Sequence, residues 1–322
     1  MEWGLIMLDI HRIKTVLDYA RLWEYDLTVF GSNGHLYCLN AVVDESALTT
    51  WETAHGLVIP QDYRDYLTKV GNGFAGPGYG ITPFDLGRFA PEWKEPCLHA
   101  PEFAGEYDRL AGEIAELIEK DTGDDQEEIL YDALYKRFNQ DGVLEIGTGG
   151  CAGINAIALN GSTKGFYLSL VGELEYYRVG ELGTGSKPFA EWFMEWVDKV
   201  EQVCSQLTQA QLNRSKWERE WMLEFAQYWQ KKDVAEMARL VAEIECQDSV
   251  SAKCVGFLFH FSPKNRRHLP GAEGIEYLRE RMGKIVDRQK KRQYNLSHIY
   301  YPGEAKYNVA WNPTLEDFVE HL

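Results

Sequence analysis

The stretch VLEIGTGGCAGINAIALNG, residues 143–161, decides between two folds for this chain of 322 residues. Its glycines fit a loop that cradles a cofactor between a strand and a helix, and they also fit a turn between two antiparallel strands. The first arrangement belongs to a doubly wound parallel sheet, and the second to an α+β protein with an antiparallel sheet. The neighbouring segments have to distinguish the two.

A cofactor-binding loop is the first hypothesis. Residues 145–150, EIGTGG, resemble the acidic-x-Gly-x-Gly signature of S-adenosylmethionine-dependent methyltransferases, and the same glycines have the spacing of a dinucleotide-binding loop. Such a loop must lead into a helix, but residues 153–159 allow at most two turns before the hairpin-type pair Asn160-Gly161. No acidic residue ends the next strand and no further strand–helix alternation follows, so a methyltransferase is the alternative and not the preferred function.

Composition indicates a soluble protein of the cytoplasm. The chain is 45% hydrophobic and 26% charged, which is typical of globular domains, and its length suits two of them. No apolar run approaches the roughly 18 residues of a membrane span, and the start, MEWGLIMLDIHRIK, lacks the regions of a secretory signal. The six cysteines form no C-x-x-C pair and have no metal-ligand spacing from histidine, so we expect buried reduced thiols and no metal site.

Charge is distributed unevenly along the chain. Residues 1–200 contain 15 Lys and Arg against 33 Asp and Glu, a net charge of −18, whereas residues 201–322 contain 18 against 17, a net charge of +1. The acidic part repels nucleic acid and favours a cationic partner. A basic helix is expected around Lys284–Arg292, but no base-reading motif accompanies it, so we expect a solvated face or an intramolecular partner for the acidic region.

Hydrophobic periodicity and turn residues predict a mixture of helices and strands. The expected helices lie at 11–22, 60–70, 101–138 (a pair), 186–200, 217–245 (a hairpin of two), 275–292 and 314–322. The expected strands lie at 143–147, 154–159, 165–171, 174–179 and 254–261, with one hairpin around Asn33-Gly34 and another within 298–311. Residues 121–128, DTGDDQEE, form the densest acidic run and are typical of a solvated loop and helix start.

Taken in order, these segments resemble the SUKH superfamily, the Smi/Knr-like proteins, over residues 45–203. The family pattern has a helix bearing a glutamate, a Gly-x-x-(Leu/Ile)-Pro-x-x-Tyr-Arg helix ending at Asn-Gly, three strands joined by small-residue turns, and a Phe-x-x-Trp-x-x-x-Trp helix. The matching residues are Glu52, Gly56, Ile59, Pro60, Tyr63, Arg64, Asn72, Gly73, Leu144 to Gly147, Ala156 to Leu159, Gly161, Gly165, Phe166, Phe189, Trp192 and Trp196.

The resemblance implies an α+β fold with a mostly antiparallel sheet and packed helices, in which the glycines of GTGGCAG turn the chain and bind no cofactor. It divides the chain into a SUKH-like domain at 1–203 and a helix-rich C-terminal extension at 204–322 of unknown role. Within the first domain, the acidic helical stretch at about 101–140 is an enlarged insertion, and it departs from the family pattern as the extension does.

Members of that superfamily are chiefly bacterial immunity proteins, with a fungal branch in cell-wall regulation. The resemblance therefore implies a non-enzymatic protein that binds and neutralises a cognate toxin, with no catalytic residues, cofactor or metal; a regulatory scaffold of the Smi/Knr type is a further alternative. The expected partner is a protein toxin with a cationic surface, such as a nuclease. The residues expected to contact it are Asp121, Asp124, Asp125, Glu127 and Glu128, whereas Trp51, Trp93 and Tyr79 are expected in the core.

Overall fold

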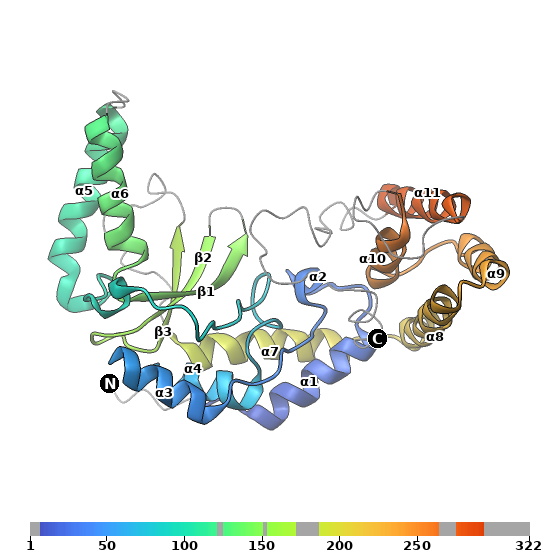
Figure 1. The fold of residues 1–322 in the computed structure, drawn as a ribbon, viewed down its shortest axis with the longest axis horizontal. Coiled ribbons are helices and arrows are strands. Elements are labelled where there is room, and N and C mark those ends of the chain that lie inside the picture. The colour runs from blue at the N-terminus through green and yellow to red at the C-terminus, as the bar shows by residue number, and fades with distance from the viewer. Residues whose placement is uncertain (1–6, 121–124, 151–152, 172–186, 264–274, 293–322) are drawn as a thin grey trace. The chain divides into compact units, whose positions relative to one another are not determined.

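The computed structural model describes residues 7–120, 125–150, 153–171, 187–263 and 275–292. These residues form helices and a four-stranded antiparallel sheet of strand order β1-β2-β3-β4, so the chain is an α+β protein (Figure 1). The chain divides into two compact units. The N-terminal unit comprises residues 1–14 and 39–198, and the C-terminal unit comprises residues 15–38 and 199–322. The division falls within two helices, α1 (Ile10–Trp23) and α7 (Phe189–Ser205).

Local sequence signals begin and end the first helices of the N-terminal unit. The Asp44 side chain accepts a hydrogen bond from the Ala47 N–H at 2.9 Å and caps one helix, which Gly56 ends with a φ of 61°. The helix predicted at 60–70 is confirmed, with its second half in π-helical geometry. The helices and turns before α7 are α3 (Glu45–His55), α4 (Gln61–Asp65), η1 (Tyr66–Val70), η2 (Pro91–Lys94), η3 (Pro101–Phe103), α5 (Ala104–Lys120) and α6 (Asp125–Asn139).

The sheet consists of β1 (Val143–Gly150), β2 (Gly153–Ala158), β3 (Phe166–Val171) and the short β4 (Lys187–Pro188), which confirms three predicted strands. Ala156 pairs with Leu168, and both lie in a buried cluster with Cys97. Because side chains alternate along a strand, the neighbouring Tyr167 points to the other face, where its ring stacks on Trp192 of α7 at 4.1 Å. The sheet is therefore covered on both faces.

The predicted aromatic stripe of α7 lies in the core. Phe189 and Phe193 are fully buried. The Phe189 ring meets Tyr63 edge-on at a centroid distance of 5.3 Å, and Phe193 lies 5.1 Å from Tyr66. Offset and edge-on aromatic pairs of this kind add to the stabilisation that comes from area burial. The helix of residues 61–70 is thereby fixed against α7.

The regular secondary structure that is described in the C-terminal unit is all helical, and three polar side chains begin its helices. Thr208 and Gln211 form a capping box, Asp233 accepts from the Glu236 N–H at 3.2 Å, and Ser251 caps the next helix. The helices predicted at 11–22, 217–245 and 275–292 are confirmed. Besides parts of α1 and α7, the unit contains α2 (Ser32–His35), α8 (Gln209–Lys231), α9 (Val234–Glu245), α10 (Ala252–Phe261) and α11 (Glu276–Arg292).

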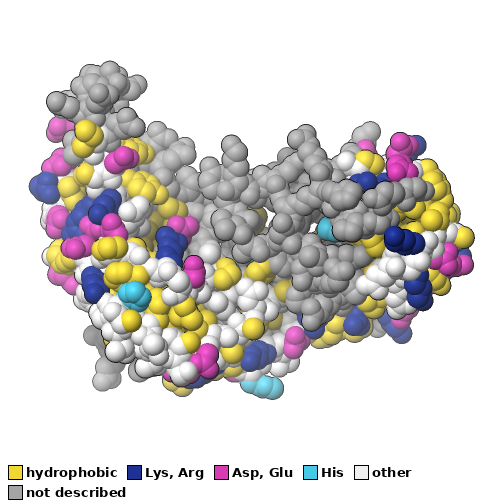
Figure 2. Space-filling model, viewed as in Figure 1, with side chains coloured by type: hydrophobic (Ala, Val, Ile, Leu, Met, Phe, Trp, Pro, Cys, Tyr) yellow, Lys and Arg dark blue, Asp and Glu magenta, His cyan; other side chains and the backbone are white. Residues whose placement is uncertain are grey.

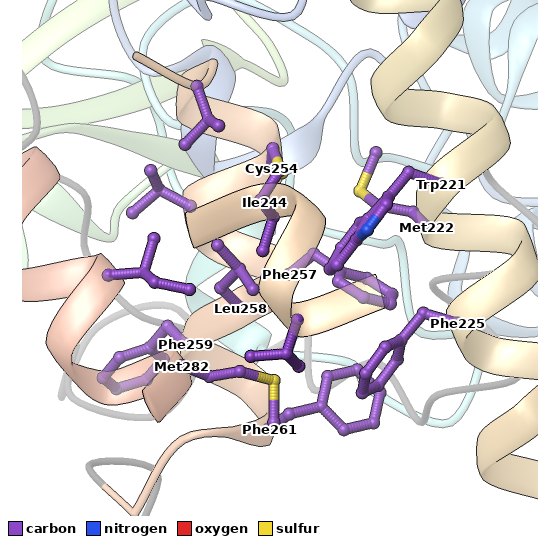
Figure 3. Packing of buried hydrophobic residues seen from close by; sticks show 14 of the residues in the cluster. Trp221, Met222, Phe225, Ile244, Cys254, Phe257, Leu258, Phe259, Phe261 and Met282 are labelled. Carbon is purple, nitrogen blue, oxygen red and sulfur yellow. The ribbon is translucent and has the colours of Figure 1, made fainter. Parts of the chain in front are cut away.

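A large apolar core holds this unit together (Figure 3). Trp221 and Phe225 of α8 face Phe257 and Phe261 of α10, and Met282 of α11 closes the cluster. The Phe225 and Phe261 rings meet at a centroid distance of 5.0 Å. The indole N–H of Trp221, which is buried with its ring, donates to the Leu240 carbonyl at 3.0 Å, so its polar atom is satisfied.

The strand predicted at 254–261 is wrong, because these residues lie in α10. The segment CVGFLFHF is apolar nearly throughout, and a short run of this kind has no periodicity that separates a buried strand from a buried helix. The tertiary environment decides the outcome. Ser251 supplies an N-cap whose hydroxyl accepts from the Cys254 N–H at 3.2 Å, and α8 and α11 cover the helix.

The hairpin predicted around Asn33-Gly34 is also wrong, because a single helical turn, α2, takes its place. Two of the residues expected in the second strand bury their side chains in the C-terminal unit. Cys38 joins its apolar core, and the Tyr37 hydroxyl donates to the carboxyl of Glu24 at 2.8 Å. Burial of these side chains overrides the local hairpin preference of the Asn-Gly pair.

The compact units differ from the domains expected at 1–203 and 204–322, because residues 15–38 group with 199–322. The contacts at the end of α1 explain the difference. The buried ammonium group of Lys253, on α10, donates to the Arg21 carbonyl at 3.1 Å and satisfies an acceptor that the helix end leaves open. The second half of α1 therefore depends on helices that lie far away in the sequence.

Other predictions fall on residues that the structure does not describe. The strand at 174–179, the hairpin within 298–311 and the helix at 314–322 lie outside the described residues. In the part of the chain that is described, no helix combines the length and the apolar character needed to cross a membrane.

We expect a chain that ends at residue 203 to lose stability and solubility. It would lack α8–α11, so Tyr25, Leu36 and Cys38, which are buried in the C-terminal core, would lose their packing partners. The soluble fraction after expression and the thermal unfolding midpoint, both compared with the full chain, measure the effect. A monomeric product that unfolds cooperatively near the midpoint of the full chain would contradict the expectation.

Candidate partner-binding surface

The glycine stretch that opens the question of fold joins two antiparallel strands. β1 ends at Gly150, β2 begins at Gly153, and the two pair in antiparallel register with Glu145 opposite Ala156. The element after the glycines is thus a strand, whereas a phosphate-binding loop presents its N–H groups at the start of a helix. The antiparallel strands expected on either side of the glycines are confirmed, while Cys151 and Ala152 between them lie outside the described residues.

Two of the glycines are required by the backbone and not by a ligand. A Cβ at Gly147 would lie 2.4 Å from the Gly80 carbonyl oxygen, because the segment before residue 82 crosses β1 there. That segment is held by the Thr82 N–H, which donates to the Ile146 carbonyl at 2.7 Å. Gly150 has a φ of 93°, which L-residues rarely adopt. Gly149 has neither constraint, since its nearest neighbour would be 3.7 Å away.

The glutamate and arginine of the family motif form a structural ion pair. Glu52 of α3 accepts the Ile59 N–H at 2.8 Å and also bonds the guanidinium of Arg64 in α4. Arg64 bonds Glu45 as well, at 2.6 Å. These contacts fix the turn between α3 and α4, in which Pro60 is the N-cap residue of α4. The buried Tyr63 follows one turn later.

The Asn-Gly pair that ends the second motif helix meets the backbone of the segment at residues 81–84. The Asn72 amide donates to the Phe84 carbonyl at 3.2 Å and accepts the Phe84 N–H at 2.7 Å. Gly73 has a φ of 82°, and a Cβ there would lie 2.6 Å from the Ile81 carbonyl oxygen. Both residues therefore position the backbone.

The remaining motif residues surround β3 and α7. Gly161 and Gly165 both have positive φ, at 73° and 86°, in the turn between β2 and β3. The Gly165 N–H donates to the Ala158 carbonyl, and its carbonyl accepts the Phe189 N–H at the start of α7. Trp192 stacks on Tyr167 as described above, and Trp196 is 5% exposed.

The α5–α6 hairpin stands out from the sheet in the N-terminal unit (Figure 1). Its base is a buried cluster that includes Tyr107, Leu134 and Phe138. His99, which is 5% exposed, joins this cluster, and its Nε2 lies 2.7 Å from the Phe138 carbonyl oxygen. A carbonyl only accepts, so Nε2 carries the proton of a neutral imidazole. Burial lowers the pKa of His99.

Charge sets the hairpin apart from the rest of its unit. Residues 104–139 contain 11 Asp and Glu against 4 Lys and Arg. Two of the four cations are bound at the base of the hairpin, where Lys136 pairs with Glu92 at 2.9 Å and Arg137 pairs with Glu106 at 3.0 Å. The outer part of the hairpin therefore carries an excess of negative charge that few local cations offset.

Apolar side chains are also exposed on the hairpin. Ile129 is 69% exposed and Tyr131 is 36% exposed, both on α6. The exposed Glu116 of α5 and Asp132 of α6 belong to the same hairpin. Figure 2 shows hydrophobic side chains interspersed with acidic and basic ones over these two helices. Exposed apolar groups ringed by charge are typical of surfaces that bind other proteins.

The structure describes the predicted contact residues only in part. Asp121 and Asp124 lie outside the described residues. Asp125, Glu127 and Glu128 form the first turn of α6, where acidic side chains are favoured by the helix dipole, and only their backbone is described. Sequence reasoning did not identify Ile129 as exposed, because its place in an apolar stripe of the helix indicates burial.

A second surface feature has no sequence signature. His55 stacks on Phe89 at a centroid distance of 4.3 Å, and the Lys94 ammonium lies 5.4 Å from the centre of the same ring. Arg88 lies over Trp93 at 5.8 Å. Trp93 itself is 5% exposed. Its predicted place in the core is thus confirmed, as is that of Trp51 at 4%, whereas Tyr79 is half-buried.

The described residues contain no group of three His, Cys, Asp or Glu side chains arranged to hold a metal ion. Cys38, Cys97, Cys204 and Cys254 are buried free thiols, and Cys246 is exposed. Burial raises the pKa of Cys97 to about 11, so this thiol stays protonated at neutral pH.

Comparison with known proteins finds no match. No protein-family model, no curated protein and no solved structure is similar to this chain.

We expect Gly147→Ala to destabilise the protein and Gly149→Ala to leave it nearly unchanged. The added methyl group at 147 meets the Gly80 backbone, which cannot move without breaking the neighbouring strand contacts, and the loss should be about 1–3 kcal/mol. At 149 the change should stay within about 0.5 kcal/mol. Urea unfolding measures both. Equal losses of unfolding free energy in the two variants would show that the glycines are required for something other than the close approach of Gly80 to β1.

We expect acid to weaken the base of the hairpin through His99. Its folded-state pKa lies below the ordinary value of 6.5, so the unfolded chain binds a proton more readily. The neutral imidazole contributes fully to the free energy of unfolding above pH 6.5, and this contribution is lost as the pH falls below that value. His99→Gln keeps a donor for the Phe138 carbonyl but cannot titrate. The thermal unfolding midpoint should therefore fall more steeply between pH 7.5 and pH 5 in the wild type than in His99→Gln. An equal fall of the midpoint in the two proteins would exclude this role of His99.

Proposed function

We propose that this chain is an immunity-type binding protein that neutralises a cationic protein toxin in the cytoplasm. The observation that carries the proposal is the projecting α5–α6 hairpin, which combines 11 acidic residues with exposed Ile129 and Tyr131. An enzyme that acts on nucleic acid has a cationic cleft, so a nuclease is the class of toxin that fits best.

The chemistry of the hairpin suits association with a cationic protein. Its excess of carboxylates accelerates encounter with a positive surface, and the effect weakens as salt increases. Exposed apolar and aromatic side chains supply the contact area that becomes dehydrated on binding. The buried base at Tyr107 and Phe138 holds the two helices in a fixed arrangement before the partner arrives, which reduces the entropy lost on binding.

The ordered resemblance to the SUKH superfamily supports the same proposal. Its motif residues serve the scaffold here: Glu52 and Arg64 join two helices, and Asn72 and Gly73 join the backbone of two segments. The binding function then lies in the acidic helical stretch, which departs from the family pattern. A SUKH-like domain that carries its partner specificity in an insertion accounts for the structural roles of the motif residues and for the departure of the acidic stretch from the family pattern.

We expect co-expression of the chain to protect cells from the toxin encoded beside its gene, and we expect reversal of hairpin charge to abolish protection. The test variant is Glu116→Lys with Asp132→Lys, both exposed on the hairpin. The matched control is Glu220→Lys with Glu280→Lys, two exposed acids of the C-terminal unit that change the net charge equally. The measurements are the growth of cells that co-express the toxin with each variant, and the dissociation constant of each purified variant for the toxin.

If the hairpin variant and the control variant both protect the cells, the toxin contacts another surface. If both lose protection, the net charge of the chain, and not the hairpin, governs binding. Absence of protection by the wild-type chain would favour a regulatory scaffold without a toxin partner. Titration with S-adenosylmethionine tests the methyltransferase alternative separately, and flat heats are the expected result because a strand follows the glycine turn.

A further inference from the structure

Among the described residues of the C-terminal unit, the buried ammonium group of Lys253 has no carboxylate within ion-pair distance. Lys253 lies in the first turn of α10 and is 3% exposed. Its ammonium group donates to the Arg21 carbonyl at 3.1 Å and lies 4.5 Å from the centre of the Tyr25 ring. A carbonyl group and a ring attract a cation but carry no net charge, so these contacts do not neutralise the buried charge.

A second cation, Arg219 of α8, faces the same place. Ser215, one turn earlier on α8, donates its hydroxyl to the Trp23 carbonyl at 3.0 Å, so this face of α8 lies along the end of α1. Burial raises the pKa of Tyr25 and lowers that of Lys253, and the charge of Arg219 acts on both groups. The half-buried side chain of Arg219 forms no hydrogen bond or ion pair with the described part of the chain.

The hydroxyl group of Tyr25 is the third polar group at this place. Tyr25 is 1% exposed, and its hydroxyl has no hydrogen-bond partner among the residues that the structure describes. The same holds for the buried Nε of Arg219. Buried donors nearly always have a partner, and an unpaired one is a common sign of a bound water molecule or ion. Two such donors beside a buried cation therefore call for an acceptor from outside the chain.

The carboxyl groups nearby do not balance these cations. Burial raises the pKa of Glu24 and of Glu218 to about 7, so each is only partly ionised at neutral pH. The end of α1 supplies about half a negative charge, against the two positive charges of Lys253 and Arg219. The carboxyl groups are bound by other side chains: Glu24 by Thr28 and Tyr37, Glu218 by Ser251, and Asp26 by Arg214.

We propose that Lys253, Arg219 and the Tyr25 hydroxyl form a binding site for a small oxyanion, such as a carboxylate or a phosphate-type anion. The guanidinium group presents N–H donors whose spacing matches two oxygens of such an anion, the ammonium group supplies a second charge, and the hydroxyl donates. A water molecule would satisfy the hydroxyl but would leave the positive charge unbalanced.

The site is charged and reached from solvent at neutral pH. Burial lowers the pKa of Lys253 to about 8, so its ammonium form predominates at pH 7, and an arginine is always charged. Arg219 is only half-buried and connects the site with solvent. An anion held there would join α1, α8 and α10, so its binding should stabilise the C-terminal unit. The site is independent of the hairpin proposed to bind a toxin.

Thermal unfolding of the full chain at pH 7 tests the site. Sodium sulfate or sodium acetate is added at millimolar concentration, and sodium chloride keeps the ionic strength constant. The midpoint of the wild type should rise with one or both oxyanions and reach a plateau. The dissociation constant, obtained from this increase, should weaken at least about tenfold in Arg219→Gln and about fivefold in Tyr25→Phe.

Lys216→Gln is the matched control, because Lys216 is an exposed residue of the same helix and its replacement removes the same charge. This variant should keep the wild-type increase. A wild-type midpoint that rises with neither sulfate nor acetate would overturn the proposal. An increase that Arg219→Gln and Lys216→Gln share equally would also overturn it, because such an increase reflects the general action of these salts on protein surfaces.

Should Arg219→Gln fail to fold, Tyr25→Phe decides. This change removes only a hydroxyl group that has no hydrogen-bond partner in the described part of the chain, so the fold should tolerate it. A weaker dissociation constant in Tyr25→Phe supports the site. An unchanged constant would show that the anion does not meet the Tyr25 hydroxyl, and the proposed site would be wrong.

Discussion

The buried ammonium group of Lys253 is the constraint on which the arrangement of the C-terminal unit depends. It lies 4.5 Å from the centre of the Tyr25 ring and donates to the Arg21 carbonyl, at the negative end of α1. A buried cation costs several kcal/mol unless such partners offset the loss of water, and burial lowers its pKa to about 8. The end of α1 and Tyr25, which follows it, supply these partners, so residues 15–38 fold with helices that follow residue 199 in the sequence.

The N-terminal unit separates scaffold from surface. Its motif residues meet backbone and side-chain partners inside the fold, as the Asn72 amide does with both polar groups of Phe84. Its densest negative charge lies instead on a hairpin, where two of the four cations, Lys136 and Arg137, are bound at the base. A rigid scaffold with a charged projection can change its partner without disturbing its core, because the residues that fold the unit are not those that would meet the partner.

The glycine turn shows how a motif can mislead. A pattern such as EIGTGG indicates that the backbone has a positive φ or lies too close to another group for a Cβ atom. It does not indicate which group lies there. Here the occupant is the chain itself, since the Gly80 carbonyl lies where a Cβ at Gly147 would be. A cofactor phosphate would make the same demand on a glycine, so only the following element, a strand in place of a helix, separates the two.

The sequence by itself determined the periodic elements: α7 with its aromatic stripe, the α8–α9 hairpin, and the three strands from Val143 onward. The helices have a regular apolar spacing, and the strands are short apolar runs separated by glycine-containing turns. Only the tertiary structure decided that 254–261 is a helix, that Asn33-Gly34 makes no hairpin, and that Ile129 is exposed. For the first two, local preference is weak or misleading, and burial against residues distant in the chain fixes the outcome. Ile129 lies outside the buried cluster that Leu134 and Phe138 form at the base of the hairpin.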